Sequence, residues 1–338
     1  MHGSGGTEGQ SVQVGFKGAS TSGITIGHDD DHRLSLAEGD EVVKDEVGVA
    51  LLDPSGLILA STVLQIQHRI TGVRVLGILV PKDLLPRYRQ YLVDVYGGRA
   101  RDLGWKTKAG ESEDARFLRP ALLSVLANQA EDSELIAQAK KLALAWLDDH
   151  KAVDPDMLGV VLTTAARHGD RDLFDRMHAA AKQEKEENFR GTLLFSLGSF
   201  QDPEIIKVAL PIVLSDEFDS RESLGILWGP AQRRQTRDYA YDFVKQNWDH
   251  LIAKLPTDSG SFLPYVAGGY CDSQHRQDVE NFFSGRSTKY TGGPRILTQV
   301  LEGIDLCVAY KNAQEASVAE FLETYKPAQS VGAGSPYK

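Results

Sequence analysis

The feature that most constrains this chain is a helix-start signal that recurs along it. Asp132, Asp170 and Asp202 each stand three residues before an apolar residue of a helical stripe. An Asp in that place can accept hydrogen bonds from the free N–H groups of a first helical turn, so we interpret all three as helix caps. The intervals between them, from residue 132 to 170 and from 170 to 202, are both in the thirties. Helix pairs that repeat at such a period are typical of an α-solenoid.

Apolar residues recur at helical spacing over residues 81–326, and short Gly, Asp or Pro breaks separate the stripes. Each stripe predicts an amphipathic helix with one buried face, and Pro211 predicts a kink. We therefore expect a mainly α fold, with a helical-repeat superhelix over residues 81–326. The last two stripes are residues 296–304 and 318–322. One stripe that we expect to be buried comprises Phe117, Leu118, Ala121, Leu122, Val125 and Leu126.

Residues 11–66 differ from this pattern. Apolar and polar residues alternate in "SVQVGFKG", and "VALLDPSGLILAS" places two apolar runs around a turn sequence. We predict a small antiparallel β module there. Residues 67–80 are interpreted as a joint, residues 1–10 as a flexible leader and residues 327–338 as a disordered tail.

The chain is acidic, with 37 Lys and Arg against 47 Asp and Glu and a net charge of −10. Because phosphate binding needs a basic surface, we expect no nucleic-acid partner. The most basic run, AQRRQTR at residues 231–237, is interpreted as a solvated helix start rather than a nucleic-acid groove. No apolar run approaches the ~20 residues of a membrane helix, and no signal peptide is visible. We expect a soluble, cytoplasmic protein with no membrane partner.

Cys271 and Cys307 are the only cysteines, and their spacing fits neither a CxxC zinc site nor a redox pair. Both lie in apolar helical stretches. We therefore expect two buried thiols, although two cysteines also allow one disulfide.

One dense group of potential metal ligands, HDDDH, occupies residues 28–32. Strand alternation would place His28, Asp30 and His32 on one face, which is a possible three-ligand set for zinc. A catalytic zinc site also needs supporting partners and a pocket, for which a short module offers little material. We therefore favour a polar loop, and expect no metal or other cofactor in this chain.

The sequence contains neither the HExxH zinc motif nor the GxSxG nucleophile motif. Acidic residues are plentiful, however, and a curved helical array could hold two carboxylates about 5–10 Å apart, as a glycosidase requires. A stand-alone glycosidase-type hydrolase with two carboxylates on the concave face stays open as an alternative. The sequence does not decide whether the chain is an enzyme.

Several stretches together resemble one known domain. They include "VPKDLLPRYRQYLVDVYG", "AVDPDMLGVVLTTAARHGDRDLFDRM" and "YAYDFVKQNWDHLIAKLP". They are similar to the C-terminal helical domain of gluzincin zinc aminopeptidases, the group of aminopeptidase N and the endoplasmic-reticulum aminopeptidases. The resemblance covers residues 80–325, and "VGVALLDPSGLILASTVL" more faintly resembles the β-sandwich that precedes this domain.

The resemblance implies a superhelix of HEAT or armadillo type, which in that family covers the catalytic domain and closes its peptide chamber. The family's zinc ligands are not in this sequence, so the resemblance places zinc in a catalytic domain that the chain lacks, and no catalytic residue is carried over. The first helices of the family's superhelix are also missing between Ile66 and Val80. This suggests a truncated or internally deleted fragment. Helix faces left uncapped by the deletion could be covered in a homodimer.

We therefore favour a noncatalytic peptide-binding, partner-binding or gating domain derived from a zinc aminopeptidase, with a pure interaction scaffold as a second alternative. Arg116, Arg119 and Arg190 lie on the first helices of their predicted repeats and are our candidate contacts for a peptide or protein partner. Surface solvation, or ion pairing between repeats, is the other interpretation of these three arginines.

Overall fold

The structure is a computed structural model that describes residues 27–28, 34–35, 77–256 and 259–326. The chain divides into two units, Met1–Val47 and Gly48–Lys338. The described part of the first unit is the antiparallel pair β1 (Gly27–His28) and β2 (Leu34–Ser35), in which Gly27 faces Ser35 and His28 faces Leu34. The rest of the predicted β module, the leader, most of the joint and the tail lie outside the described residues.

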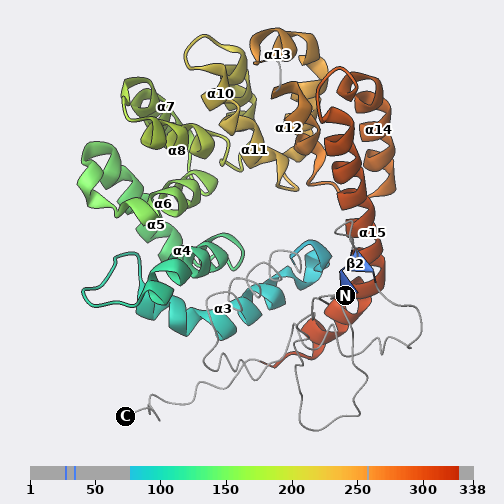
Figure 1. The fold of residues 1–338 in the computed structure, drawn as a ribbon. Helices are drawn as coiled ribbons and strands as arrows, with labels where there is room; N and C mark the ends of the chain where they lie inside the picture. The colour runs from blue at the N-terminus through green and yellow to red at the C-terminus, as the bar shows by residue number, and fades with distance from the viewer. Residues whose placement is uncertain (1–26, 29–33, 36–76, 257–258, 327–338) are drawn as a thin grey trace, which may run out of the picture. The chain divides into compact units, whose positions relative to one another are not determined.

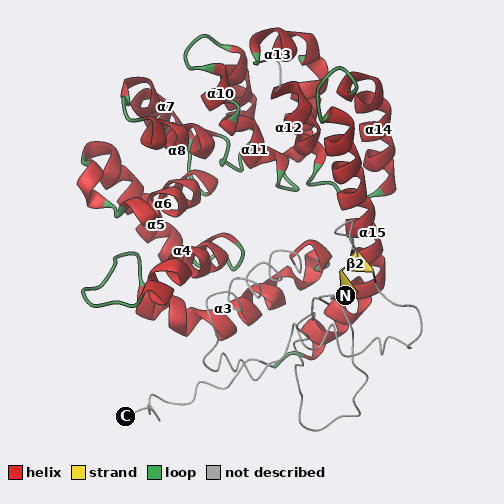
Figure 2. Cartoon of the chain, viewed as in Figure 1, coloured by secondary structure: helices red, strands yellow, loops and turns green. Residues whose placement is uncertain are grey.

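In the described part of the second unit, all regular elements are helices (Figure 1; Figure 2). The mainly α fold is therefore confirmed for this unit. The first elements are η1 (Lys82–Leu84), α3 (Leu85–Leu103), α4 (Glu113–Asn128), α5 (Ser133–Asp148), η2 (His150–Ala152), α6 (Pro155–Arg167), α7 (Arg171–Gln183), α8 (Glu187–Leu197) and α9 (Pro203–Ala209). They are followed by η3 (Leu210–Leu214), α10 (Ser220–Ser223), α11 (Gly225–Ala231), α12 (Arg237–Gln246), α13 (Trp248–Lys254), η4 (Ser259–Ala267), α14 (Ser273–Ser287) and α15 (Gly293–Thr324).

The predicted caps at Asp132, Asp170 and Asp202 are confirmed. Each side chain accepts a hydrogen bond from a backbone N–H group of the first turn: Asp132 from Glu134 and Leu135, Asp170 from Leu173, and Asp202 from Glu204. These bonds span only two or three residues. Local sequence is therefore enough to place the starts of α5, α7 and α9.

At Pro211, where the sequence predicts a kink, the helix changes type. The α-helical hydrogen bonding of α9 ends at Ala209, and the chain continues from Leu210 to Leu214 as the 3₁₀-helix η3. A proline lacks the N–H that would continue the α-helical pattern, so the change of helix type falls beside it.

Helices of the second unit pack in two layers (Figure 1). In one layer α4, α6, α8 and α11 lie side by side. Helices α5 and α7 belong to the second layer, where α5 packs against α6 and α7 packs against α8. Trp146 of α5 meets Phe189 of α8 edge to face at 5.6 Å, and Phe174 of α7 meets Phe200 at 5.4 Å. This order agrees with the predicted helix pairs, while the HEAT-like superhelix stays a prediction.

One predicted core residue lies at the surface. Leu118 and Leu122 of α4 are buried as expected, but Phe117 is 60% exposed and Ala121 is only half-buried. Phe117 and Ala121 are one turn apart, on a face of α4 beside the buried one. The prediction for Phe117 is wrong because α4 buries a narrower stripe than its apolar residues occupy.

The last helix is longer than either of its predicted stripes. Helix α15 runs through both of them without a break, first against α14 and η4 and then back to α3. Tyr91 of α3 meets Phe321 and Tyr325 edge to face, with ring centroids 5.5 and 5.2 Å apart. Despite the length of α15, neither it nor any other helix in the described ranges is long and apolar enough to cross a membrane.

The two cysteines are joined. Cys271 and Cys307 form a disulfide with their Cα atoms 5.3 Å apart, so the expectation of two buried thiols is wrong. Cys271 lies just before α14 and Cys307 lies on α15. Because these helices pack side by side, they bring together residues that are 36 positions apart. That proximity comes from tertiary packing, which the spacing of the cysteines does not reveal.

Candidate functional site

A groove of about 720 Å³ crosses three helices of one layer. Helix α4 contributes Pro120 and Ala121, α6 contributes Gly159 and Val160, and α8 contributes Gly191 and Phe195 to its lining. We call this feature the α4–α6–α8 groove. Most of its lining is small or apolar, and Glu187 is its one charged lining residue among those described.

Gly159 and Gly191 stand within helices and line this groove. A Cβ atom added at either position would meet no other atom within 4 Å, so packing inside the chain does not require glycine there. A glycine inside a helix is less stable than alanine by roughly 0.5–1 kcal/mol. Glycine at these two positions lowers the stability of α6 and α8 and leaves open space at the groove, which suits a site that a ligand's backbone approaches closely.

Two exposed aromatic side chains accompany the groove. Phe195 of α8 lines it and is 41% exposed. Phe117 of α4 is one turn from the lining residue Ala121. Large apolar side chains that stay in solvent beside a cleft are typical of binding surfaces.

A second cleft of about 540 Å³ lies between α11 and η4, and it is aromatic. Trp228 lines one side, and Phe262 and Tyr265 line the other. The rings of Phe262 and Tyr265 are stacked with centroids 6.5 Å apart. The hydroxyl of Tyr265 hydrogen-bonds Gln299 of α15 at 3.1 Å, which connects this cleft to the last helix.

A third cleft of about 520 Å³, near α8 and α10, is polar, and its charges are largely paired. His178 and Lys182 both contact Glu217 at 2.8 Å. The hydrogen bond from Lys182 lowers the pKa of Glu217, although partial burial of the carboxyl opposes the shift. The pairing of Lys182 with Glu217 and of Arg190 with Glu222 reduces the charge that these four lining residues offer to a ligand.

The three arginines predicted to contact a partner all form ion pairs within the chain. The pairs are Arg116 with Asp156, Arg119 with Glu111, and Arg190 with Glu222. Arg119 is only 1% exposed, and its hydrogen bond lowers the pKa of Glu111. None of the three lines the α4–α6–α8 groove, and Arg190 lines the polar cleft. Their role in binding a partner stays a prediction.

The basic run at residues 231–237 connects helix ends. Its three arginines each donate to a backbone carbonyl: Arg233 to Gly198, Arg234 to Ile78, and Arg237 to Gly269. Carbonyls near helix C-termini lack helical partners, and arginines commonly satisfy them. The absence of a nucleic-acid partner stays a prediction.

The candidate metal ligands are only partly described. His28 lies in β1, whereas Asp30 and His32 lie outside the described residues. Within the described ranges, no group of three or more His, Cys, Asp or Glu residues is placed to hold a metal ion.

The sequence does not mark the groove residues as functional. Gly159 and Gly191 carry no charged or catalytic group, and the helical spacing predicts that Phe117 lies in the core. The one signal in the sequence is that Gly159 and Gly191 each stand inside a predicted helix. Neither a turn nor a helix cap explains a glycine at these positions.

Comparison with known proteins identifies the domain. A family model described as an ERAP1-like C-terminal domain matches residues 64–306, which is most of the chain. The chain belongs to the ERAP1-like C-terminal domain family. This confirms the resemblance to the C-terminal domain of aminopeptidases.

The ERAP1-like domain is similar to parts of several larger proteins. It is 25% identical over 235 residues to Aminopeptidase 2 of Candida albicans, covering 68% of this chain and 25% of that protein. It is 26% identical over 244 residues to Aminopeptidase M1-B of Oryza sativa, covering 69% and 27%. For Aminopeptidase M1 of Arabidopsis thaliana the values are 24% over 259 residues, 73% and 28%. The chain thus spans about a quarter of the length of these relatives, and the family's zinc site lies in a catalytic domain outside the matched part.

Proposed function

We propose that this ERAP1-like domain is a noncatalytic binding or gating domain that holds a segment of a peptide, or of a protein partner, in the α4–α6–α8 groove. The observation that carries the proposal is the pair Gly159 and Gly191. Both leave open space at the groove although nothing inside the chain requires glycine. An apolar side chain of the ligand would lie over these glycines, against Val160 and Phe195.

The character of the groove supports an apolar ligand segment. Burying a Leu or Phe side chain contributes roughly 1.5–3 kcal/mol, which is enough for a weak, exchangeable contact. The relatives are named aminopeptidases, and this chain matches about a quarter of their length. We therefore propose that this part contacts the peptide, and that cleavage belongs to another part of such a protein.

The alternative of a glycosidase-type hydrolase receives less support from the carboxyl groups. Such an enzyme uses one carboxylic acid with a raised pKa as its general acid. Every described carboxyl group with a shifted pKa has a lowered pKa, which is the opposite of what a general acid needs. These groups belong to Glu111, Asp154, Asp216, Glu217, Asp272 and Asp278.

The proposal is tested by filling the groove. The probe is a fluorescein-labelled alanine decapeptide with one central Phe, and its affinity is measured by fluorescence anisotropy. In Gly191→Leu the new side chain would occupy the place of the ligand's Phe, so we expect affinity to fall by at least about tenfold, or about 1.4 kcal/mol.

The matched control is Gly303→Leu. Gly303 lies within α15, away from the groove, and a Cβ there also meets no atom within 4 Å. This variant should bind the peptide like the unchanged chain. Equal loss in the two variants, or no binding of the peptide by the unchanged chain at millimolar concentration, would overturn the proposal.

A further inference from the structure

Helix α15 is packed at its two ends and loosely held between them. Its first part buries Leu297, Val300 and Ile304, and its far end buries Val318 and Leu322. Between Ile304 and Val318 no residue of the helix is buried, although Val308 and Tyr310 are partly covered. Few buried contacts over more than three turns make local opening easier there than in the core.

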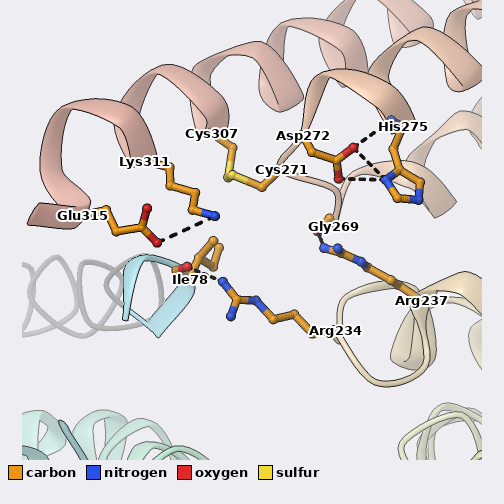
Figure 3. The surroundings of a disulfide bond; sticks show 10 residues. All are labelled: Ile78, Arg234, Arg237, Gly269, Cys271, Asp272, His275, Cys307, Lys311 and Glu315. Carbon is orange, nitrogen blue, oxygen red and sulfur yellow. Dashed lines mark hydrogen bonds and ion pairs between the residues drawn. A yellow bond between two sulfur atoms is a disulfide. The ribbon is translucent and has the colours of Figure 1, made fainter. Parts of the chain in front are cut away.

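The disulfide lies at the start of this loosely held stretch. Cys307 is three residues beyond Ile304, and its partner Cys271 stands directly before Asp272, the cap of α14 (Figure 3). Asp272 in turn contacts the backbone and the ring of His275. The bond therefore joins α15 to the capped start of α14. Besides this bond, α14 and α15 pack side by side, and Arg276 of α14 forms an ion pair with Asp305 of α15 at 3.1 Å.

The far end of α15 is held on α3 by hydrogen bonds and by ring contacts. Arg87 donates to the backbone carbonyls of Leu322 and Glu323 at 3.2 and 2.8 Å. The hydroxyl of Tyr325 donates to Asp94 at 3.0 Å. Together with the Tyr91 ring contacts, these bonds hold a helix end more than 200 residues away in sequence against α3. A constraint that limits the movement of α15 lowers the entropy cost of forming this long-range contact and so stabilises it.

We propose that the Cys271–Cys307 bond is a redox-sensitive clasp that keeps the far half of α15 on α3, and that its reduction by a dithiol releases this half. In the reaction a thiolate of the reductant attacks one cysteine sulfur, and the resulting mixed disulfide is resolved by the reductant's second thiol. The bond between the cysteines breaks and a disulfide forms within the reductant. Two electrons and two protons pass to Cys271 and Cys307, which become thiols.

Release follows because the disulfide limits the movement of α15 at Cys307, where its loosely held stretch begins. With the bond intact, the start of the loose stretch cannot move away from α14, so the far end stays close to its partners on α3. Without it, the stretch after Cys307 keeps partly buried contacts such as those of Val308 and Tyr310, and the turn before it is held by the buried Ile304 and by the ion pair of Arg276 with Asp305. An exposed ion pair contributes little to stability. Opening of the far end is then opposed by its own contacts with α3 and by the burial of Leu322, without the covalent bond, while the layers of α4 to α8 stay folded.

Hydrogen exchange of the full chain tests this proposal, in the oxidised form and after native treatment with dithiothreitol. Intact mass and alkylation of both thiols confirm reduction. We expect amide exchange in residues 309–325 to increase by about tenfold, with a smaller increase in residues 85–96 and no change in residues 155–197. The variant with both Cys271→Ser and Cys307→Ser should show the reduced pattern with and without dithiothreitol.

Three results would overturn the clasp. One is unchanged exchange in residues 309–325 after confirmed reduction, and another is an equal increase across residues 155–197, which would indicate a general loss of stability. The third is a bond that dithiothreitol reduces only in denaturant. If the double variant does not fold, reduction of the unchanged chain still decides between these outcomes.

Discussion

The repeats from α4 to α8 and the last helix α15 are both helical, but different contacts hold them. In the repeats, α5 and α7 begin at the capping residues Asp132 and Asp170 and pack against helices nearby in the chain. Helix α15 begins after Gly292, which has a left-handed φ of 78° and provides no side-chain cap. It packs on α14 and η4, and a disulfide and long-range contacts with α3 hold it as well.

The difference shows that local contacts and long-range contacts stabilise different parts of the same helical unit. A cap or a contact between neighbouring helices closes a short loop, whereas the contact of α15 with α3 orders a chain segment more than 200 residues long. Residues at the far end of α15 should therefore matter for stability through tertiary packing, and capping residues of the repeats through local hydrogen bonds.

The largest expected effect is at the far end of α15. Leu322 is 1% exposed, so Leu322→Ala should lower the free energy of unfolding by about 2–5 kcal/mol, through lost burial and the cavity left behind. On the same helix Leu306 is 70% exposed, so Leu306→Ala should change it by less than about 0.5 kcal/mol. Urea denaturation followed by circular dichroism measures both. Similar values for the two would show that α15 is not anchored by packing.

A smaller effect is expected from a cap in the repeats. Asp170→Ala removes the hydrogen bond to the N–H of Leu173 and should cost about 1 kcal/mol in the free energy of unfolding. Asp172 is in the same first turn and is exposed, so Asp172→Ala should cost only about 0.3 kcal/mol, through its interaction with the helix dipole. Equal losses in urea denaturation would mean that charge alone, and not capping, stabilises this helix start.

The last expected effect is a dependence of stability on pH, and it concerns His168, the residue after α6. Burial, followed by the nearby positive charges of Arg167 and Lys140, lowers its pKa from 6.5 to about 4. Between these values the unfolded chain binds the proton and the folded chain does not, so stability should rise as the pH increases from 4 to 6.5. Above pH 6.5 this contribution is constant. The slope is at most about 1.4 kcal/mol per pH unit, and partial exposure of the ring makes it smaller.

Nuclear magnetic resonance can follow the ring proton of His168 directly, with His168→Gln used to assign the signal. The same variant should show a flatter dependence of stability on pH between 4 and 6.5. A titration midpoint near 6.5 would contradict the structure, because it would require a His168 ring that is open to solvent.

Much of the helical layer could be predicted from the sequence. The capping bonds of Asp132, Asp170 and Asp202 lie within their own first turns, and Leu118 and Leu122 recur at helical spacing. Phe117 shows the limit of this reasoning. Spacing identifies an apolar face, but the neighbouring helix decides how wide a part of that face is covered.

The candidate site and the closing contacts could not be predicted in the same way. Gly159 and Gly191 form one groove only because α6 and α8 lie side by side. Likewise, the arginines Arg116, Arg119 and Arg190 carry suitable charge for a ligand, but each has an acidic partner in the fold.

By itself, the sequence determined the helical class, the principal helix starts and the resemblance to aminopeptidase C-terminal domains. These depend on hydrogen bonds and spacings within a few residues, or on matching stretches of sequence. Only the tertiary structure decided that Cys271 bonds to Cys307, that α15 returns to α3 and that three helices leave a groove. The physical reason is that each of these features joins residues whose distance is set by packing and not by their separation along the chain.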